Sequence, residues 1–240
     1  MFLSTKYAVV SVVLLLSLFF FSACASDTPS TTHVGFNEFF NDTHDIMSIS
    51  AGIESNYIVL NDGTLWGWGW FLPNLRGRGH VHNNQLFNIT PIHLLDNVIA
   101  VSGSTRHLFV ITDDNRLWGW GENSLGQLGD GTIANRNDKV HIMDGVTAVS
   151  TNFHSTLALH EDGTISAWGI GRRTPQQIGH NAIAISVGSE LSYFVTNDFE
   201  LWSFCFQYET SKLVKENVRS VSSDGDLTYV IRAYPKSLLA

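Results

Sequence analysis

Short apolar runs separated by polar turns follow one another along most of the chain, and they recur as one repeated pattern. Five units begin at Ile49, Val101, Val149, Ile185 and Val221, with start-to-start spacings of 52, 48, 36 and 36 residues. A position within a unit is given below as its offset, the number of residues after the unit start. Self-similarity with this period indicates a tandem repeat architecture, in which each unit packs on its neighbours.

Large apolar side chains stand at the same offsets in successive units. Offset eight is aromatic or leucine, offset ten is aliphatic and offset nineteen is aromatic. In that order the residues are Tyr57, Phe109, Leu157, Tyr193 and Tyr229; Val59, Ile111, Leu159, Val195 and Ile231; and Trp68, Trp120, Trp168 and Phe204. We interpret the offset-nineteen rings as structural core residues. The glycines that alternate with them, such as Gly119 and Gly121, are expected to let a bulky indole pack between adjacent units.

The local pattern of each unit is that of strands joined by tight turns. Apolar runs lead into Asn61-Asp62-Gly63 and Glu161-Asp162-Gly163, where Gly supplies the positive φ that a hairpin turn needs. A further short apolar stretch lies upstream, at residues 91–95 and 139–143, which gives about four strands per unit. The sequence therefore predicts an all-β fold, a β-propeller of four-stranded antiparallel blades, with a solenoid as the alternative.

The number of residues predicts an incomplete ring. Residues 34–240 are enough for about four to five blades, and the fifth unit runs into Pro235 without a Gly-Trp strand. An open ring leaves apolar faces on its end blades. We expect either the segment of residues 35–45, with its three Phe, to supply a strand or cover an end, or two copies to associate through the open end blades.

The segment LWGWGENSLGQLGDG at residues 117–131, preceded by His107 and the apolar strand of residues 108–111, resembles the repeat of the regulator of chromosome condensation family. The resemblance covers about residues 46–234, although only the second unit has the Gly-Gln-Leu-Gly-Asp-Gly run whole. It implies a propeller, seven-bladed in eukaryotes. Exported bacterial members include an inhibitor protein of β-lactamase that occludes an enzyme with loop aromatics, and the 36-residue units here are similar to its short repeats.

The first 24 residues resemble a bacterial export signal. Lys6 precedes an apolar run at residues 7–21, which is shorter than the roughly 20 residues that span a bilayer as a helix. Phe21-Ser22-Ala23-Cys24 resembles a lipobox, in which the signal is cut before a Cys that receives a diacylglycerol. We expect a signal peptide at residues 1–23, a lipid-anchored flexible tether at 24–33 starting with Cys24, and the propeller at 34–240.

This N-terminus predicts an exported lipoprotein on the extracytoplasmic side of a bacterial membrane. A permanent membrane anchor and an ordinary cleavage site are the alternatives. Nucleotide exchange on a small GTPase, the activity of the eukaryotic relative, is not expected, because that partner is cytosolic. No disulfide is expected between Cys24 and Cys205, the two cysteines of the chain.

Composition and charge argue against several function classes. Only 15% of the residues are charged, and the net charge of −8 becomes −9 when residues 1–23 and Lys6 are removed. With 14 Lys and Arg and no basic run, nucleic acid is not an expected partner. His80-Val81-His82 lacks a regular third metal ligand, and His154-Ser155 would point to opposite faces of a strand. We expect no enzyme activity, no metal and no cofactor.

The candidate site is a surface made of loops. We expect the loop at offsets three to six and the loop leading to the next blade to share one face, with the Asp-Gly turns on the other. Large groups in these loops are candidate partner contacts, because aromatics and Arg anchor protein interfaces. They are Trp70, Phe71, Arg76, Arg78, Arg106, Phe153, His154, Arg172, Arg173 and Glu190.

The function that follows is that of a binding module. The sequence predicts a lipoprotein that binds a protein partner at the cell surface through one loop face. A cell-wall or glycan-binding surface protein and a truncated, inactive repeat fragment are the alternatives.

Overall fold

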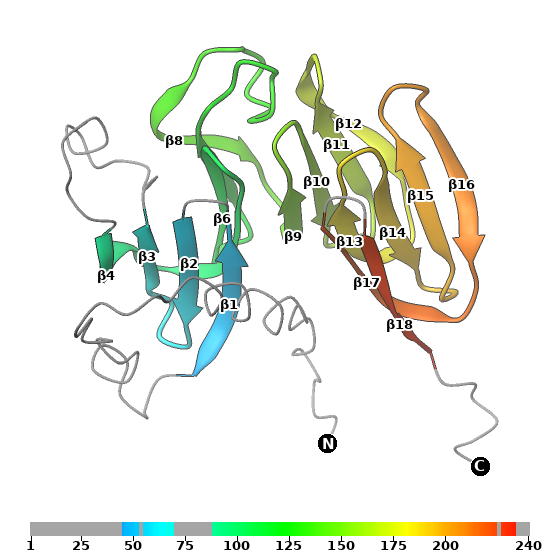
Figure 1. Cartoon of the computed structure of the whole chain (residues 1–240), viewed down its shortest axis with the longest axis horizontal. Coiled ribbons are helices and arrows are strands. Elements are labelled where there is room, and N and C mark those ends of the chain that lie inside the picture. Colours follow the sequence, from blue (N-terminus) through cyan, green and yellow to red (C-terminus); the bar gives the residue numbers. More distant parts are fainter. Residues whose placement is uncertain (1–44, 53–54, 70–87, 225–226, 234–240) are drawn as a thin grey trace, which may run out of the picture.

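The computed structural model describes residues 45–52, 55–69, 88–224 and 227–233, and their regular structure consists of β-strands. Within these residues four sheets have four antiparallel strands each and a fifth sheet has two. Figure 1 shows the sheets following one another around an arc in chain order. The expectation of an all-β fold built from four-stranded antiparallel blades is confirmed. None of the described ranges forms a helix able to cross a bilayer.

The strands divide into blades that match the repeat units. Blade 1 contains β1 (Ile46–Ala51), β2 (Ser55–Leu60), β3 (Leu65–Gly69) and β4 (Asn88–Leu95). Blade 2 contains β5 (Val98–Gly103), β6 (His107–Thr112), β7 (Leu117–Gly121) and β8 (Arg136–Met143). Blade 3 contains β9 (Val146–Thr151), β10 (Ser155–His160), β11 (Ile165–Gly169) and β12 (Arg172–Gly179). Blade 4 contains β13 (Ala182–Val187), β14 (Ser192–Thr196), β15 (Leu201–Cys205) and β16 (Thr210–Lys215), and blade 5 contains β17 (Val218–Asp224) and β18 (Leu227–Arg232).

Each four-stranded blade is a meander, so its connections alternate between two faces of the arc. The connections from first to second and from third to fourth strand lie on what we term the loop face. The Asp-Gly turns and the links between blades lie on the turn face, where the amide of Val98 donates to the carbonyl of Gly63 at 2.9 Å. The expectation that the loop leading to the next blade lies on the loop face is wrong, because this link lies on the turn face beside the Asp-Gly turns. The loop that shares the face with offsets three to six leads instead to the fourth strand of its own blade.

The hydrophobic core lies between neighbouring blades. The offset-eight and offset-ten side chains of one blade pack against the offset-nineteen ring of the next blade, as Tyr57 and Val59 do with Trp120. Trp120, Trp168 and Phe204 are 1%, 0% and 3% exposed. Trp68 is only half-buried, and no sheet precedes its blade in the described residues.

The structure explains the glycines of the third strand differently from the expectation drawn from the sequence. A Cβ on Gly119 would lie 2.7 Å from the ring of Phe109, which is the offset-eight residue of the same blade. Gly119 and Phe109 are paired across β6 and β7. The glycine therefore makes room for its own blade's ring, whereas the indole of Trp168 packs on Gly129, in the β7–β8 loop of the preceding blade.

Neighbouring first strands are joined by a repeated serine contact. The hydroxyl oxygen at offset one accepts a hydrogen bond from the amide at offset two of the next blade. The pairs are Ser50 with Gly103 at 2.8 Å, Ser102 with Thr151 at 3.2 Å, Ser150 with Val187 at 3.0 Å and Ser186 with Ser223 at 2.8 Å. Every junction between described blades thus has the same polar link beside its apolar core.

Candidate functional site

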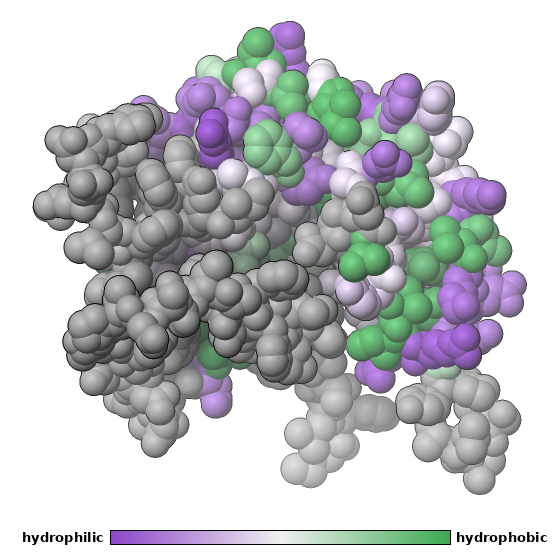
Figure 2. Space-filling view, viewed as in Figure 1, coloured by the Kyte–Doolittle hydropathy of each residue, from purple (hydrophilic) through white to green (hydrophobic). Residues whose placement is uncertain are grey.

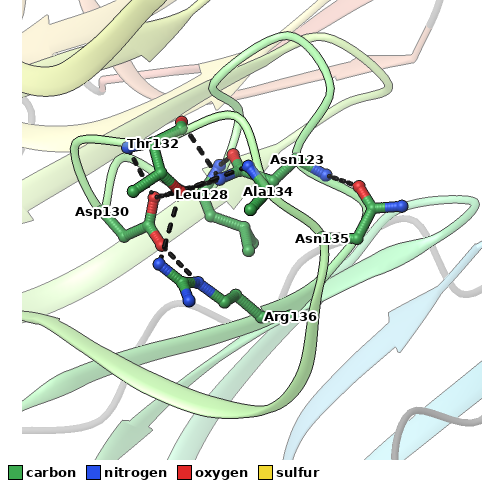
Figure 3. A network of polar contacts seen from close by, with 7 residues as sticks. All are labelled: Asn123, Leu128, Asp130, Thr132, Ala134, Asn135 and Arg136. Carbon is green, nitrogen blue, oxygen red and sulfur yellow. Dashed lines mark hydrogen bonds and ion pairs between the residues drawn. The ribbon is translucent and has the colours of Figure 1, made fainter.

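The most elaborate loop of the loop face is the β7–β8 connection, residues 122–135. Its backbone is held by buried polar side chains rather than by strand pairing (Figure 3). Asn123 is fully buried; its side-chain oxygen accepts from the amide of Leu128 at 2.9 Å, and its side-chain nitrogen donates to Asp130 at 3.0 Å. The amide of Asn123 in turn donates to the side chain of Asn135 at 2.8 Å. This loop is therefore a fixed platform.

Asp130 is the charged centre of that platform. Its carboxylate is 2% exposed and accepts hydrogen bonds from the hydroxyl of Thr132 at 2.8 Å and from Nε of Arg136 at 2.6 Å. Burial by itself raises the pKa of the Asp130 carboxyl, but the hydrogen bonds from Thr132, Arg136 and Asn123 outweigh it, so the pKa lies below the ordinary 3.8. The carboxylate is ionised at neutral pH and serves the loop's structure.

Four of the exposed apolar side chains on the loop face come from loops that contact one another. Leu125, Phe153, Ile170 and Leu191 are 39%, 43%, 51% and 36% exposed. They come from the β7–β8, β9–β10, β11–β12 and β13–β14 connections, and so from three successive blades. Figure 2 shows apolar groups among polar ones along this upper edge of the molecule. We call these four side chains the loop-face patch.

Backbone contacts bring the patch residues together. The carbonyl of Leu125 accepts from the amide of Gly171 at 2.9 Å, and the amide of Ile170 donates to the carbonyl of His154 at 3.0 Å. The ring of Phe153 lies edge-on to that of His154, with centroids 4.9 Å apart. These contacts connect three of the four loops, those that carry Leu125, Phe153 and Ile170, into one surface.

The fourth member joins through the β9–β10 loop. The side-chain nitrogen of Asn152 donates to the carbonyl of Gly188 at 2.5 Å, and the amide of Gly188 donates to the carbonyl of Leu191 at 3.1 Å. The oxygen of the Asn152 side chain accepts from the amides of His154 and Ser155, both at 2.9 Å. One asparagine thus fixes the Phe153 loop and ties it to the loop that carries Leu191.

Among the candidate contacts from the sequence, Phe153, His154 and Glu190 belong to or adjoin the loop-face patch and are exposed. Arg106 and Arg173 are also exposed on this face. Their backbone carbonyls accept hydrogen bonds from the β7–β8 loop. The carbonyl of Arg106 accepts from the amide of Glu122, and that of Arg173 accepts from the amide of Gly131, both at 2.8 Å. Other candidates lie outside the described residues: Trp70, Phe71, Arg76 and Arg78, together with the pair His80 and His82.

Arg172, also a candidate contact from the sequence, lies between two blades. Its side chain is 14% exposed and reaches from β12 to the β15–β16 loop of the next blade. There it donates to the carbonyl of Phe206 at 3.1 Å and to the carboxylate of Glu209 at 2.5 Å, and the guanidinium lies over the rings of Phe204 and Phe206. Within the chain, Arg172 links blades 3 and 4.

The described residues offer little for metal or acid-base chemistry. They contain no group of three or more His, Cys, Asp or Glu placed to hold a metal ion. His107 is 3% exposed, with Nε2 2.8 Å from the hydroxyl of Thr151 on the next blade. Burial, with a smaller contribution from His154, lowers the pKa of His107 to about 3, so the ring is neutral at neutral pH and helps join two blades.

Sequence reasoning missed Leu125, Ile170 and Leu191 as site residues. It favoured aromatic and charged side chains, whereas aliphatic residues within a β-rich chain look like strand interior. A signal existed for Ile170, because it follows the repeat glycine Gly169 where a turn is needed. Ile170 has a φ of 52°, a left-handed conformation that a β-branched residue rarely adopts.

Comparison with known proteins identifies one repeat in this chain and supports its fold. Residues 98–127 match the model of the regulator of chromosome condensation (RCC1) repeat. The ultraviolet-B receptor UVR8 of Arabidopsis thaliana is 35% identical over 96 residues, which is 38% of this chain and 21% of the receptor. This chain therefore spans about a fifth of that relative's length.

Solved structures extend the similarity over most of the chain. Human WBSCR16 matches with a TM-score of 0.67 and 17% identity over 81% of this chain and 60% of its own. Prp20p of Saccharomyces cerevisiae, described with its binding to Gsp1p and histones, matches with a TM-score of 0.67 and 19% identity over 82% of this chain and 57% of its own. At these identities the likeness shows the fold alone, which is a β-propeller.

Proposed function

We propose that this protein, whose second blade is a regulator of chromosome condensation repeat, is a protein-binding module that acts through the loop face of its propeller. The observation that supports this is the loop-face patch of Leu125, Phe153, Ile170 and Leu191, which three blades assemble from separate loops. Single exposed apolar residues are ordinary on a protein surface, but neighbouring ones on fixed loops mark interaction sites.

The backbone of Ile170 supports the same proposal. A branched side chain in the left-handed region costs roughly 1–3 kcal/mol, and glycine would avoid that cost. Glycine adopts positive φ without that cost, as Gly169 and Gly171 do on either side of Ile170. A strained isoleucine whose side chain is half in solvent contributes little to the fold, and its use is best explained by a partner.

The relatives give a precedent for the class of ligand. Prp20p, which shares the fold, binds the proteins Gsp1p and histones. For this chain, the export signal expected from the sequence of residues 1–24 leads us to propose a protein partner on the extracytoplasmic side of a bacterial membrane. The anionic character of the chain, with a net charge of −8, makes nucleic acid a poor ligand.

Substitution of Ile170 separates binding from folding. Ile170→Gly removes the exposed side chain and relieves the backbone, so this variant should be at least as stable as the parent and should lose most of its partner. Val214→Ser, on the outer strand β16, is a matched control, because Val214 is 52% exposed and lies away from the loop-face patch. It should retain the partner.

The full chain is immobilised, and the surface proteins that it recovers are quantified. The recovered partner is then titrated against each variant to measure its affinity. Equal affinity of Ile170→Gly and the parent would contradict a role for the loop-face patch. Binding to purified wall polysaccharide with no protein partner would instead favour the glycan-binding alternative.

We propose further that Cys24 carries a lipid. Support comes from the small residues before it and the apolar run that precedes them, in a segment outside the described residues. Growth with a fatty-acid analogue should label the parent and not Cys24→Ser, and Cys205→Ser should be labelled like the parent. Equal labelling of the parent and Cys24→Ser would contradict the anchor.

A further inference from the structure

The outer part of the junction between blades 3 and 4 differs from that between blades 2 and 3. In blade 2 the β7–β8 loop fills this part with Leu128, which is fully buried in one cluster with Phe109 and Trp168. Blade 3 has no such loop, because only Ile170 and Gly171 separate β11 from β12. Other groups must therefore occupy the space between blades 3 and 4.

Those groups leave a cavity of about 180 Å³ between β12 of blade 3 and the β15–β16 hairpin of blade 4. Phe206 packs edge-on against Phe204, with ring centroids 5.1 Å apart, and the guanidinium of Arg172 lies over both rings. The cavity wall includes Arg172, Gln176, Phe204, Glu209 and Ser211. Because Gln176 and Ser211 are exposed, the cavity opens to solvent.

One wall of the cavity is polar where the other junctions are apolar. The fourth-strand residue that pairs with offset eighteen is Ile92 in blade 1 and Val140 in blade 2, but Gln176 in blade 3. Directly paired residues share a face of the sheet, and Ala167, the partner of Gln176, packs in the core toward blade 4. Gln176 thus faces blade 4 from a position that is aliphatic in blades 1 and 2.

Ser211 belongs to the opposite wall. It pairs with Phe204, whose ring packs against blade 3, so the hydroxyl of Ser211 faces blade 3 as well. Within the part of the chain that the structure describes, neither the side chain of Gln176 nor this hydroxyl has a hydrogen-bond partner. A side-chain amide and a hydroxyl both donate and accept, so the cavity offers both kinds of group to a ligand.

The charges that border the cavity cancel each other. Arg172 donates to the carboxylate of Glu209 at 2.5 Å and to the carbonyl of Phe206 at 3.1 Å. An anion would compete with Glu209 for the guanidinium, and a free amino acid would have to separate the ion pair to use its own two charges. The ligand that fits is uncharged and carries several groups that donate and accept, which describes the hydroxyls of a sugar.

We propose that this cavity binds one uncharged sugar ring through its hydroxyl groups. Gln176 and Ser211 hydrogen-bond the ring from opposite walls, and the carboxylate of Glu209, which is 70% exposed, accepts from a further hydroxyl. At about 30 Å³ for each water of the liquid, the cavity has room for about six waters, which a single ring would replace. None of the four side chains of the loop-face patch lines this cavity, so it is a second site.

The test is saturation-transfer difference NMR on the full chain, with glucose, galactose, mannose and N-acetylglucosamine as probes. At least one of these sugars should receive saturation from the protein, and its affinity is then measured by titration. Titration of the corresponding methyl glycoside distinguishes a free sugar from the end unit of a glycan, since only the latter tolerates a blocked anomeric oxygen.

Substitutions on the two walls locate the binding. Gln176→Leu provides an aliphatic side chain, as in blades 1 and 2, and should weaken binding at least about tenfold. Ser211→Leu should have a similar effect, because its side chain fills the cavity. Lys212→Leu is the matched control: Lys212 is the next residue of β16 and pairs with Ser203, so it faces away from blade 3. It should bind the sugar like the parent.

Three results would overturn the proposal. The first is a parent chain that gives no signal with any of the four sugars. The second is binding that folded Gln176→Leu and Ser211→Leu retain at the affinity of the parent, which would place the sugar elsewhere. The third is binding of glucuronate or alanine, with no binding of the uncharged sugars, because the ion pair would then open for a charged ligand. If Gln176→Leu does not fold, the comparison between Ser211→Leu and Lys212→Leu decides.

Discussion

Trp120 and Trp168 occupy the same offset in neighbouring blades, yet their indole nitrogens have different surroundings. Nε1 of Trp168 donates to the carbonyl of Gln127 at 2.8 Å. Nε1 of Trp120 is buried and has no hydrogen-bond partner among the described residues. Both side chains are 1% exposed or less, so substitution of each by Phe removes the same atoms from a similar depth and differs chiefly in the polar group.

The size of the difference follows from that polar group. Trp168→Phe loses a hydrogen bond, about 1 kcal/mol net, because the carbonyl of Gln127 keeps a second donor in the hydroxyl of Thr156 at 3.1 Å. Trp120→Phe removes a buried donor without a partner, which relieves about 1–3 kcal/mol. Trp168→Phe should therefore be about 2–4 kcal/mol less stable than Trp120→Phe.

For a domain of this size the difference corresponds to at least about 4 °C in Tm. Urea titration followed by near-ultraviolet circular dichroism, with the slope compared between variants, gives the free energy of unfolding, and thermal melts give Tm. Equal stability of the two Phe variants, or the reverse order, would refute the reasoning. Trp120→Ala adds a cavity and should lower stability by about 3–5 kcal/mol.

Three further predictions concern the loop, its glycines and the serine links. Because the pKa of the folded Asp130 carboxyl is lowered, its contribution to stability is present above the ordinary 3.8 and is lost as pH falls through the lower folded value. Melting from pH 7 to pH 3 should thus show a smaller loss of Tm for Asp130→Asn, which is less stable at pH 7, than for the parent. Gly129→Ala should cost more stability than Gly145→Ala in urea titrations, since both have positive φ but only Gly129 faces a ring, at 2.7 Å; equal costs would contradict that contact. Ser150→Ala should cost about 1–3 kcal/mol by leaving an amide unpaired, and Ser222→Ala, its equivalent in blade 5, should cost less in the same titration; the opposite order would argue against the serine link.

The strands were predictable because their determinants repeat. Rings at offset nineteen and Asp-Gly turns occur in several units, so each unit supports the interpretation of the others, and Gly163 has the positive φ that its turn needs. The serine at offset one was present in all five units and was overlooked. A serine between apolar strand residues has no distinctive local signature, and its role exists only when a neighbouring amide is placed beside it.

The candidate site was less predictable, because it depends on side-chain packing between blades. The pattern of charge cannot show that Arg172 lies against Phe204 and Phe206 and bonds to Glu209. Nor does hydropathy separate Ile170, which is half in solvent, from Ile165, which is fully buried five residues before it. Ile165 lies within strand β11, whereas Ile170 lies in the turn after Gly169 with a left-handed backbone.

The serine links have a consequence for how such a chain changes over evolutionary time. Each unit encodes both halves of a junction, the acceptor at offset one and the donor at offset two, as it also encodes both halves of the apolar contact. Duplication or deletion of one whole unit in the gene therefore creates or removes a junction without altering the residues of any other. Chains of different blade number can descend from one another in single steps, while the loops diverge independently.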